Sequence, residues 1–383
     1  SRIAIMATPY SQAPDTDTLK HWLALYHAPG VGTVTFQRIL DAVPDLQSLG
    51  LQDSRELEGL GMSSAAIAAL RQTDGALIAR DLEWHAQPGN RVMTCRDPDY
   101  PVMLAQLDAP PPILYIHGNC ALLSEPQLAM VGSRHPTPAG VRIATEFAQY
   151  LSAAGLVVTS GLALGIDAAC HSGALQAGAP TIAVMGTGLD RVYPARHRDL
   201  ARQIAGHGAL VSEFPVGTAP RAENFPQRNR LISGMSLGTL VVEAALRSGS
   251  LITARYAGEQ GREVFAIPGS INNPLARGCH QLIRQGAKLV ETAQDVIDEL
   301  GMLAASCATA QTTAGNSPAG EETGKLAPDY QQLIDLIGFD NTSIDQLVYS
   351  SGLTPAEVSS MLLQLEMSGY LASSPGGLYN RLK

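Results

Sequence analysis

The stretch Leu128-Ala129-Met130-Val131-Gly132-Ser133-Arg134 decides the fold that this sequence predicts. Its apolar residues form a run of the length of a buried strand, and the glycine that follows ends the run. Pro138, shortly afterwards, is of the residue type that often stands at the first position of a helix. A short strand, a small-residue loop and a helix form the repeating unit of a parallel sheet, so the stretch predicts an α/β fold.

The same alternation of apolar runs and helical patterns continues to about residue 300. Helical patterns such as 141–151 and 253–260 lie between the runs. Alternation of this kind predicts a mainly parallel sheet with helices on both faces. An earlier run, 113–116, follows a proline-rich stretch and is predicted to be an edge strand. The other predicted strands are 128–131, 157–159, 181–185, 210–212, 239–242, 264–267 and 288–290.

A length of 383 residues predicts two or three domains, at about 150 residues each. The first is predicted over 17–87, where two helix-turn-helix pairs follow each other, and the sheet is predicted over 88–300. The turn Pro29-Gly30-Val31-Gly32 resembles the hairpin of helix-hairpin-helix modules, whose backbone amides touch DNA phosphates. The alternative is a small SAM-like helical bundle that uses its glycines only for tight turns, because few basic residues flank either turn.

The C-terminal part begins with a small, polar segment, 301–326, which predicts a flexible linker. The following segment, 327–383, has three helical patterns and a hairpin, which is typical of a winged-helix domain. Its third helix, the usual reader of the major groove, contains no Lys or Arg. From Lys325 onward the chain has three basic and six acidic residues, so we expect this module to contact protein and not DNA. The three helical patterns are 329–337, 343–349 and 355–368.

Composition and charge narrow the class of protein. With 45% apolar and 16% charged residues the chain is globular. It has no run of about 18 apolar residues and no basic-then-apolar leader, so we expect a cytoplasmic protein without a membrane span. A formal net charge of -9 argues against a broad basic surface for duplex DNA, and any nucleic-acid site must therefore be local.

The cysteines predict neither a disulfide frame nor a zinc site. They are odd in number, widely spread and never arranged as CxxC or beside clustered histidines. We therefore expect reduced, mostly buried thiols and no bound metal. The five residues are Cys95, Cys120, Cys170, Cys279 and Cys307.

Small residues follow several of the predicted strands. In an open parallel sheet, ligands bind beyond the carboxyl ends of the strands, near the point where the strand order reverses. Glycine there lets a backbone approach a ligand closely, and free amides form an anion site. Ser250 is expected to cap the helix after its loop. The loops are Gly132-Ser133-Arg134, Ser160-Gly161, Gly186-Thr187-Gly188 and Arg247-Ser248-Gly249-Ser250.

Arg228-Asn229-Arg230 lies just before one of these strands, 239–242. Arginine forks are always charged and bind phosphate oxygens in a bidentate manner, so together with the small-residue loops they predict a phosphate site. Phe225 precedes them by three residues. An exposed ring beside such arginines stacks unpaired bases, and the equally weighted alternative is a loop anchor packed on the sheet.

Nothing in the sequence predicts a nucleotide cofactor or a catalytic triad. The first loop lacks GxGxxG, and the P-loop pattern ending in Gly-Lys-Ser/Thr is missing. Asp167, His171 and Glu243 are of the types that act as acid or base. We expect structural roles instead: a helix cap for Asp167, the solvent side of a helix for His171, and orientation of an arginine for Glu243.

The motifs in their order identify a resemblance to the DNA-processing protein A family, DprA, also called Smf. The resemblance covers about residues 20–300, and the C-terminal module resembles the family more loosely. The motifs that carry it are Gly132-Ser133-Arg134, Ser160-Gly161, Gly165-Ile166-Asp167, Tyr193-Pro194, Ser212-Glu213-Phe214-Pro215, Phe225-Pro226-Gln227-Arg228-Asn229-Arg230 and Ser248-Gly249-Ser250-Leu251.

The resemblance implies an extended Rossmann-like core that binds single-stranded DNA without strong sequence preference. It also implies a homodimer, the protection of incoming DNA, and loading of the RecA recombinase during natural transformation. With the loops, it gives a DNA-binding site and no catalytic residue or cofactor. The site comprises Gly132, Ser133, Arg134, Ser160, Gly161, Phe225, Arg228, Asn229, Arg230, Ser248, Gly249 and Ser250.

Two other functions are weighed against DNA binding. One is a nucleotide phosphoribohydrolase-like enzyme on a similar sheet. Enzymes of this type resemble one another in a Pro-Gly-Gly-x-Gly-Thr loop that is followed by a catalytic Glu. This chain has Arg-Ser-Gly-Ser-Leu-Ile-Thr at that place, with Glu243 before the loop, which argues against the enzyme. The other is an adaptor whose terminal modules bind proteins and whose sheet is a scaffold.

Overall fold

The computed structural model describes two compact units, Ser1–Gln311 and Thr312–Lys383. In the first unit the described residues are 16–43, 45–71 and 75–301. In the second they are 333, 337, 342–351, 353–354, 358, 361–362, 365, 371–374 and 378–381. The predicted linker, 301–326, lies outside the described residues except for its first position.

A nine-stranded sheet, counted over the described residues, forms the centre of the first unit, in the order β1-β2-β6-β5-β4-β3-β7-β8-β9. Strands β3 to β9 are parallel, and β2 joins β6 antiparallel. The order reverses at β3, whose neighbours are β4 and β7. The strands are β1 Asn90–Thr94, β2 Ile113–Gly118, β3 Gln127–Val131, β4 Val157–Ser160, β5 Thr181–Val184, β6 Ala209–Ser212, β7 Gly238–Val241, β8 Glu263–Ala266 and β9 Lys288–Leu289.

The bounds of the seven parallel strands agree with the predicted ranges to within a residue or two. The prediction that 113–116 lies at the edge of the sheet is wrong. Strand β2 lies inside the sheet, between β6 and the antiparallel β1. Strand β1 escapes prediction because it begins with Asn90 and Arg91 and lies in the proline-rich stretch, where its apolar signal is short.

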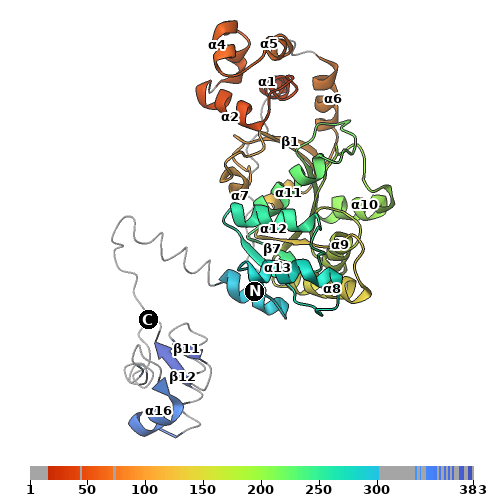
Figure 1. Ribbon diagram of the computed structural model, residues 1–383. Helices are drawn as coiled ribbons and strands as arrows, with labels where there is room; N and C mark the ends of the chain where they lie inside the picture. The colour runs from red at the N-terminus through yellow and green to blue at the C-terminus, as the bar shows by residue number, and fades with distance from the viewer. Residues whose placement is uncertain are drawn as a thin grey trace, which may run out of the picture. The chain divides into compact units, whose positions relative to one another are not determined.

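Helices cover both faces of the sheet (Figure 1). Alternate residues of each strand point to opposite faces, so Leu128 and Met130 pack with α8 and α9, whereas Ala129 and Val131 belong to the cluster that contains α11, α12 and α13. The helices are α7 Val102–Ala105, α8 Pro138–Ala153, α9 Ile166–Gln176, α10 Arg198–His207, α11 Asn224–Gly234, α12 Ser250–Glu259 and α13 Arg277–Arg284, with short 3-10 turns η1 Cys120–Ser124, η2 Ala195–His197 and η3 Pro274–Ala276.

The N-terminal helices pack on the β1–β2 end of the sheet. They share one hydrophobic core with Ile113, Tyr115 and Val216. The buried carboxylate of Asp81 accepts hydrogen bonds from the Tyr115 hydroxyl, at 2.6 Å, and pairs with the His27 ring, at 2.7 Å. The predicted pairs correspond to α1–α2 and α4–α5; the elements are α1 Thr16–Tyr26, α2 Thr33–Ala42, α3 Leu46–Leu49, α4 Ser54–Gly59, α5 Ser64–Leu70 and α6 Ala76–His85.

The second unit contains a small antiparallel sheet in the order β10-β12-β11, drawn in blue in Figure 1. The hairpin and one of the predicted helices correspond to observed elements. The helices predicted at 329–337 and 355–368 lie mostly outside the described residues. The described elements are β10 Thr342–Ser343, α16 Ile344–Ser351, β11 Leu371–Ser374 and β12 Leu378–Arg381. Among the residues described in either unit, no helix is long and apolar enough to cross a bilayer.

Candidate functional site

A cavity of about 860 Å³ lies where the strand order reverses, beyond the carboxyl ends of β3 and β7. The loops after these two strands and helices α11 and α12 supply most of its lining. Nine of the predicted site residues line it: Gly132, Ser133, Arg134, Phe225, Arg228, Asn229, Ser248, Gly249 and Ser250. Three do not: Ser160, Gly161 and Arg230.

The loop after β3 presents an unpaired guanidinium group. Gly132 is required because a Cβ there would lie 2.7 Å from the side chain of Ile166. The Ser133 amide donates to the carbonyl of Glu243, at 2.7 Å, which ties the loop to β7. Arg134 is exposed, and no described residue forms a hydrogen bond or ion pair with its guanidinium group, which lies 5.8 Å from the ring centroid of Phe225. This cation is available to an anionic ligand.

Arg228 is buried and forms part of the frame of the cavity. Its Nη1 donates to the carbonyls of Gly161 and Val184, at the ends of β4 and β5. Burial lowers the pKa of Arg228 to about 10, against the opposing effect of Asp167, so the group stays protonated at neutral pH. Arg228 therefore places a fixed positive charge in the wall of the cavity.

Arg230 points away from the cavity, contrary to the prediction. Its Nη1 donates to the carbonyl of Ala109, at 3.0 Å, and its Nη2 pairs with the carboxylate of Glu213. The reason is that the segment is helical: residues two apart on helix α11 lie about 200° apart around its axis. Pro226 obscured the helix in the sequence, although proline is tolerated in a first turn.

Ser160 and Gly161 lie behind the cavity. The Ser160 hydroxyl donates to the carbonyl of Met130, at 2.6 Å. A Cβ at Gly161 would lie 2.4 Å from Nη1 of Arg228, so only glycine lets the guanidinium group pass. These residues support the site without lining it.

The loop after β7 begins helix α12. The helix starts at Ser250 and its N-cap residue is Gly249, so the predicted Ser250 cap is wrong. Instead the hydroxyls of Ser248 and Ser250 bond to each other, at 2.7 Å. Asn229 lies beside the loop and directs its amide toward the carbonyl of Gly249, at 3.4 Å.

Two arginines that were not among the predicted site residues complete the cavity. Arg221 and Arg247 are exposed and line it. Arg247 directly precedes Ser248, so the sequence contained a signal for it, whereas Arg221 lies in a loop without a motif. Among the described lining residues there are thus four arginines and one carboxylate, that of Asp167, which makes the cavity positive in a chain of net charge -9.

The three candidate acid–base residues are held by structural contacts. Asp167 accepts from the amides of Gly161 and Ala163, at 3.1 and 3.2 Å, and burial raises its pKa. His171 is fully buried and not on a solvent side; its ring bonds to the Thr181 hydroxyl, at 2.8 Å, and burial lowers its pKa to about 3.

Glu243 does not orient an arginine as predicted. Its carboxylate accepts from the amide and the hydroxyl of Thr137, at 2.9 and 2.6 Å. Thr137 is the N-cap of α8, and its hydroxyl accepts from the amide of Gly140, at 3.0 Å. Glu243 therefore fixes the start of a helix from the neighbouring strand end.

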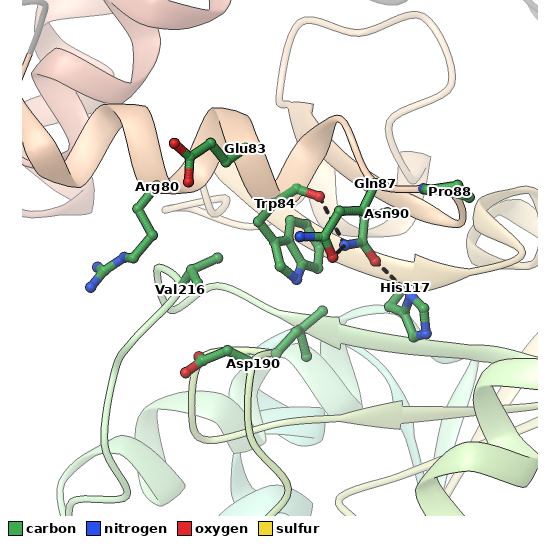
Figure 2. Close-up of a pocket in the computed structure, with 10 residues that line it drawn as sticks. Arg80, Glu83, Trp84, Gln87, Pro88, Asn90, His117, Asp190 and Val216 are labelled. Atoms are coloured by element: carbon green, nitrogen blue, oxygen red, sulfur yellow. Dashed lines mark hydrogen bonds between the residues drawn. The ribbon is translucent and has the colours of Figure 1, made fainter.

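A second cavity, of about 410 Å³, lies between α6 and the loops that follow β5 and β6. Figure 2 shows Arg80, Glu83 and Asp190 around it. Its lining has one arginine and two carboxylates, so this cavity does not favour an anion. The charge of its lining separates it from the arginine-rich cavity.

The fold and the cavity define a Rossmann-like protein with an arginine-rich cavity at the reversal of strand order, joined to a C-terminal winged-helix domain. The family model of the DNA recombination-mediator protein A matches residues 91–301, and the DprA winged helix domain matches residues 317–377. The chain belongs to the DNA recombination-mediator protein A family.

Relatives cover most of the chain. Protein Smf of Synechocystis sp. is 35% identical over 94% of this chain and 98% of its own length. Protein Smf of Escherichia coli is 42% identical over 80% of this chain and 81% of its own. DNA processing protein DprA of Streptococcus pneumoniae is 42% identical over 66% of this chain and 88% of its own.

The chain is also similar to solved structures. The structure of DprA from Streptococcus pneumoniae has a TM-score of 0.66 and 35% identity, and covers 75% of this chain and 99% of that one. A DprA structure from Helicobacter pylori, described with a single-stranded DNA binding mode, has a TM-score of 0.50 and 30% identity, and covers 55% of this chain and 95% of that one.

Proposed function

We propose that this protein binds single-stranded DNA in the arginine-rich cavity, without strong sequence preference. The observation that carries the proposal is the accumulation of four arginines against one carboxylate among the described lining residues of an otherwise acidic chain. The single-stranded DNA binding described for the Helicobacter pylori relative supports it. The further steps in the proposal are protection of incoming DNA and loading of the RecA recombinase during natural transformation, by a homodimer in the cytoplasm, and these rest on the family.

In this proposal Arg134 and Arg247 contact phosphates directly, because both guanidinium groups are exposed at the cavity. Arg228 acts from within the wall of the cavity through its buried, fixed charge, and Phe225 adds an aromatic side chain to that wall. Ser248, Gly249 and the other small residues of the loops let the strand approach the backbone. Ser160, Gly161 and Arg230 act indirectly, by holding these elements.

The proposal contains no catalytic step. Asp167, His171 and Glu243 are each committed to the hydrogen bonds of loops, strands or helix starts. Release of a free base from a nucleotide by the purified protein, lost in Glu243→Gln, would contradict this part.

The experiment is a binding titration with fluorescent single-stranded and duplex oligonucleotides of several sequences. We expect tighter binding of single strands, similar for all sequences, and a loss of affinity in Arg134→Ala. Arg80→Ala is the matched control, because Arg80 also lines a cavity, but one whose lining includes two carboxylates. Equal affinity for duplex and single strands would contradict the proposal.

A further inference from the structure

Tyr193 presents an aromatic ring at the mouth of the arginine-rich cavity. It follows β5 in the chain, lines the cavity and is 48% exposed. Its ring centroid lies 5.5 Å from that of Phe225, at an interplanar angle of 44°. No described residue forms a hydrogen bond with its hydroxyl group. Such an exposed ring is unusual, because burial of a tyrosine ring stabilises the fold.

Phe225, in contrast, has neighbours on several sides. The guanidinium carbons of Arg134 and Arg228 lie 5.8 and 5.9 Å from its ring centroid. A Cβ at Gly186 would lie 3.0 Å from the ring, so Phe225 packs directly against the backbone there. These contacts fix the ring and limit the surface that it offers to a ligand.

A base does not fit between the two rings. Carbon atoms in contact lie about 3.5 Å apart, so a base inserted between parallel rings needs about 7 Å between them. The ring centroids of Tyr193 and Phe225 lie only 5.5 Å apart. The outer face of Tyr193 is therefore the place at which a base extends the aromatic stack.

We propose that Tyr193 is the outer base-stacking residue of the site, with Phe225 packed behind it as the residue that positions its ring. The inference rests on the proposed binding of single-stranded DNA. It assigns the two components of binding to different side chains: phosphates to the arginines, and an unpaired base to a neutral ring. Contact through a neutral ring is tolerant of sequence and releases no counterion.

The test compares Tyr193→Ala, Tyr193→Phe and wild type on oligothymidylate and on an abasic strand of equal length. Tyr150→Ala is the control, since Tyr150 is also 48% exposed but lies on helix α8 outside the cavity. We expect Tyr193→Ala to weaken binding of oligothymidylate about 5- to 150-fold. The slope of log affinity against log salt and the binding of the abasic strand should not change, and Tyr193→Phe should bind as wild type.

Two outcomes would overturn the role of Tyr193 while leaving the proposed function intact, provided that Arg134→Ala weakens binding. One is that Tyr193→Ala binds oligothymidylate as tightly as wild type. The other is that Tyr193→Ala loses as much affinity for the abasic strand as for oligothymidylate. Failure of the wild type to bind single strands would overturn the proposed function itself.

A second variant, Tyr193→Trp, reports stacking directly. The chain has two tryptophans, Trp22 and Trp84, which are 5% and 7% exposed, so the added indole supplies the accessible fluorescence. We expect oligothymidylate to quench it and the abasic strand to leave it unchanged, and quenching by neither would count against stacking.

Discussion

Arg228 and Arg230 lie two residues apart on helix α11 and have different partners. Arg228 bonds to carbonyl groups at the ends of two strands, and Arg230 pairs with Glu213 on the other side of the helix. Arg134, by contrast, has an exposed guanidinium group beside the cavity. Charge alone therefore does not define the role of an arginine here; burial separates the arginine that frames the site from those that face a ligand.

This difference predicts effects of very different size on stability for substitutions of the two residues Arg228 and Arg134. Arg228→Ala should lower the free energy of unfolding by about 3 kcal/mol, because it removes the main counter-charge of the buried Asp167. Arg134→Ala should change it by no more than about 0.5 kcal/mol, because the side chain is exposed. Urea unfolding monitored by circular dichroism measures both. An equal loss of stability in the two variants would contradict the assignment.

His171 predicts a dependence of stability on pH. Its pKa in the fold is lowered by burial from 6.5 to about 3, so below pH 6.5 the unfolded chain takes up a proton that the folded protein does not. The stability that the fold gains by keeping His171 neutral is therefore complete above pH 6.5, and it is lost as the pH falls toward 3. Between pH 7 and pH 5 the loss should be about 2 kcal/mol. Chemical unfolding of wild type and His171→Gln at both pH values measures it, and an unchanged pH dependence in the variant would contradict this role.

At the scale of the elements, the start of helix α8 depends on strand β7. Glu243 follows β7 and binds the N-cap residue Thr137 through two hydrogen bonds. A Cβ at Gly140 would lie 2.5 Å from the Glu243 carboxyl carbon, so the contact is close. The loop that carries Arg134 lies between β3 and this cap, so the position of the cation depends on the pairing of two strands.

Removal of this cap tests the role of Glu243. Glu243→Ala should lower the free energy of unfolding by about 1 to 2 kcal/mol, because two donors of Thr137 lose their partner. Glu243→Gln keeps one acceptor and should lose less. Thermal unfolding compares the two variants. Loss of a chemical activity in Glu243→Gln at unchanged stability would instead indicate catalysis.

The elements also show which parts of the fold could be read from the sequence. The seven parallel strands were predictable because each is a short buried apolar run between helical patterns. Strand β1 and helix α11 were not, because β1 is half polar and α11 begins with Asn224, Phe225 and Pro226. Without that helix, the side on which Arg230 lies could not be derived. The loops at the strand ends were predictable, whereas Arg221 and the burial of Arg228 required the tertiary structure.

For the whole molecule, the distribution of charge matters more than its sum. The chain carries -9, yet the described lining of one cavity is rich in arginine. From Lys325 onward, acidic residues outnumber basic ones, six to three. The negative charge of this C-terminal part and that of the DNA phosphates repel each other, which disfavours direct contact. This agrees with a role of the winged-helix domain outside DNA binding.

Deletion of Lys325 to Lys383 should therefore leave the affinity for oligothymidylate within about twofold of wild type, or raise it slightly through the loss of negative charge. Fluorescence anisotropy at fixed salt measures the change. A large loss of affinity on deletion would assign DNA binding to the C-terminal module and contradict the location of the site.

The salt dependence of binding of a fluorescent single strand by wild type, Arg134→Ala and Arg80→Ala tests the central claim most directly. Each neutralised phosphate on a single strand contributes about -0.7 to the slope of log affinity against log salt. We predict that Arg134→Ala weakens binding of all sequences alike and makes the slope shallower by about 0.7, while Arg80→Ala leaves both affinity and slope unchanged. An affinity and a slope of Arg134→Ala equal to those of wild type would contradict a DNA site in the arginine-rich cavity.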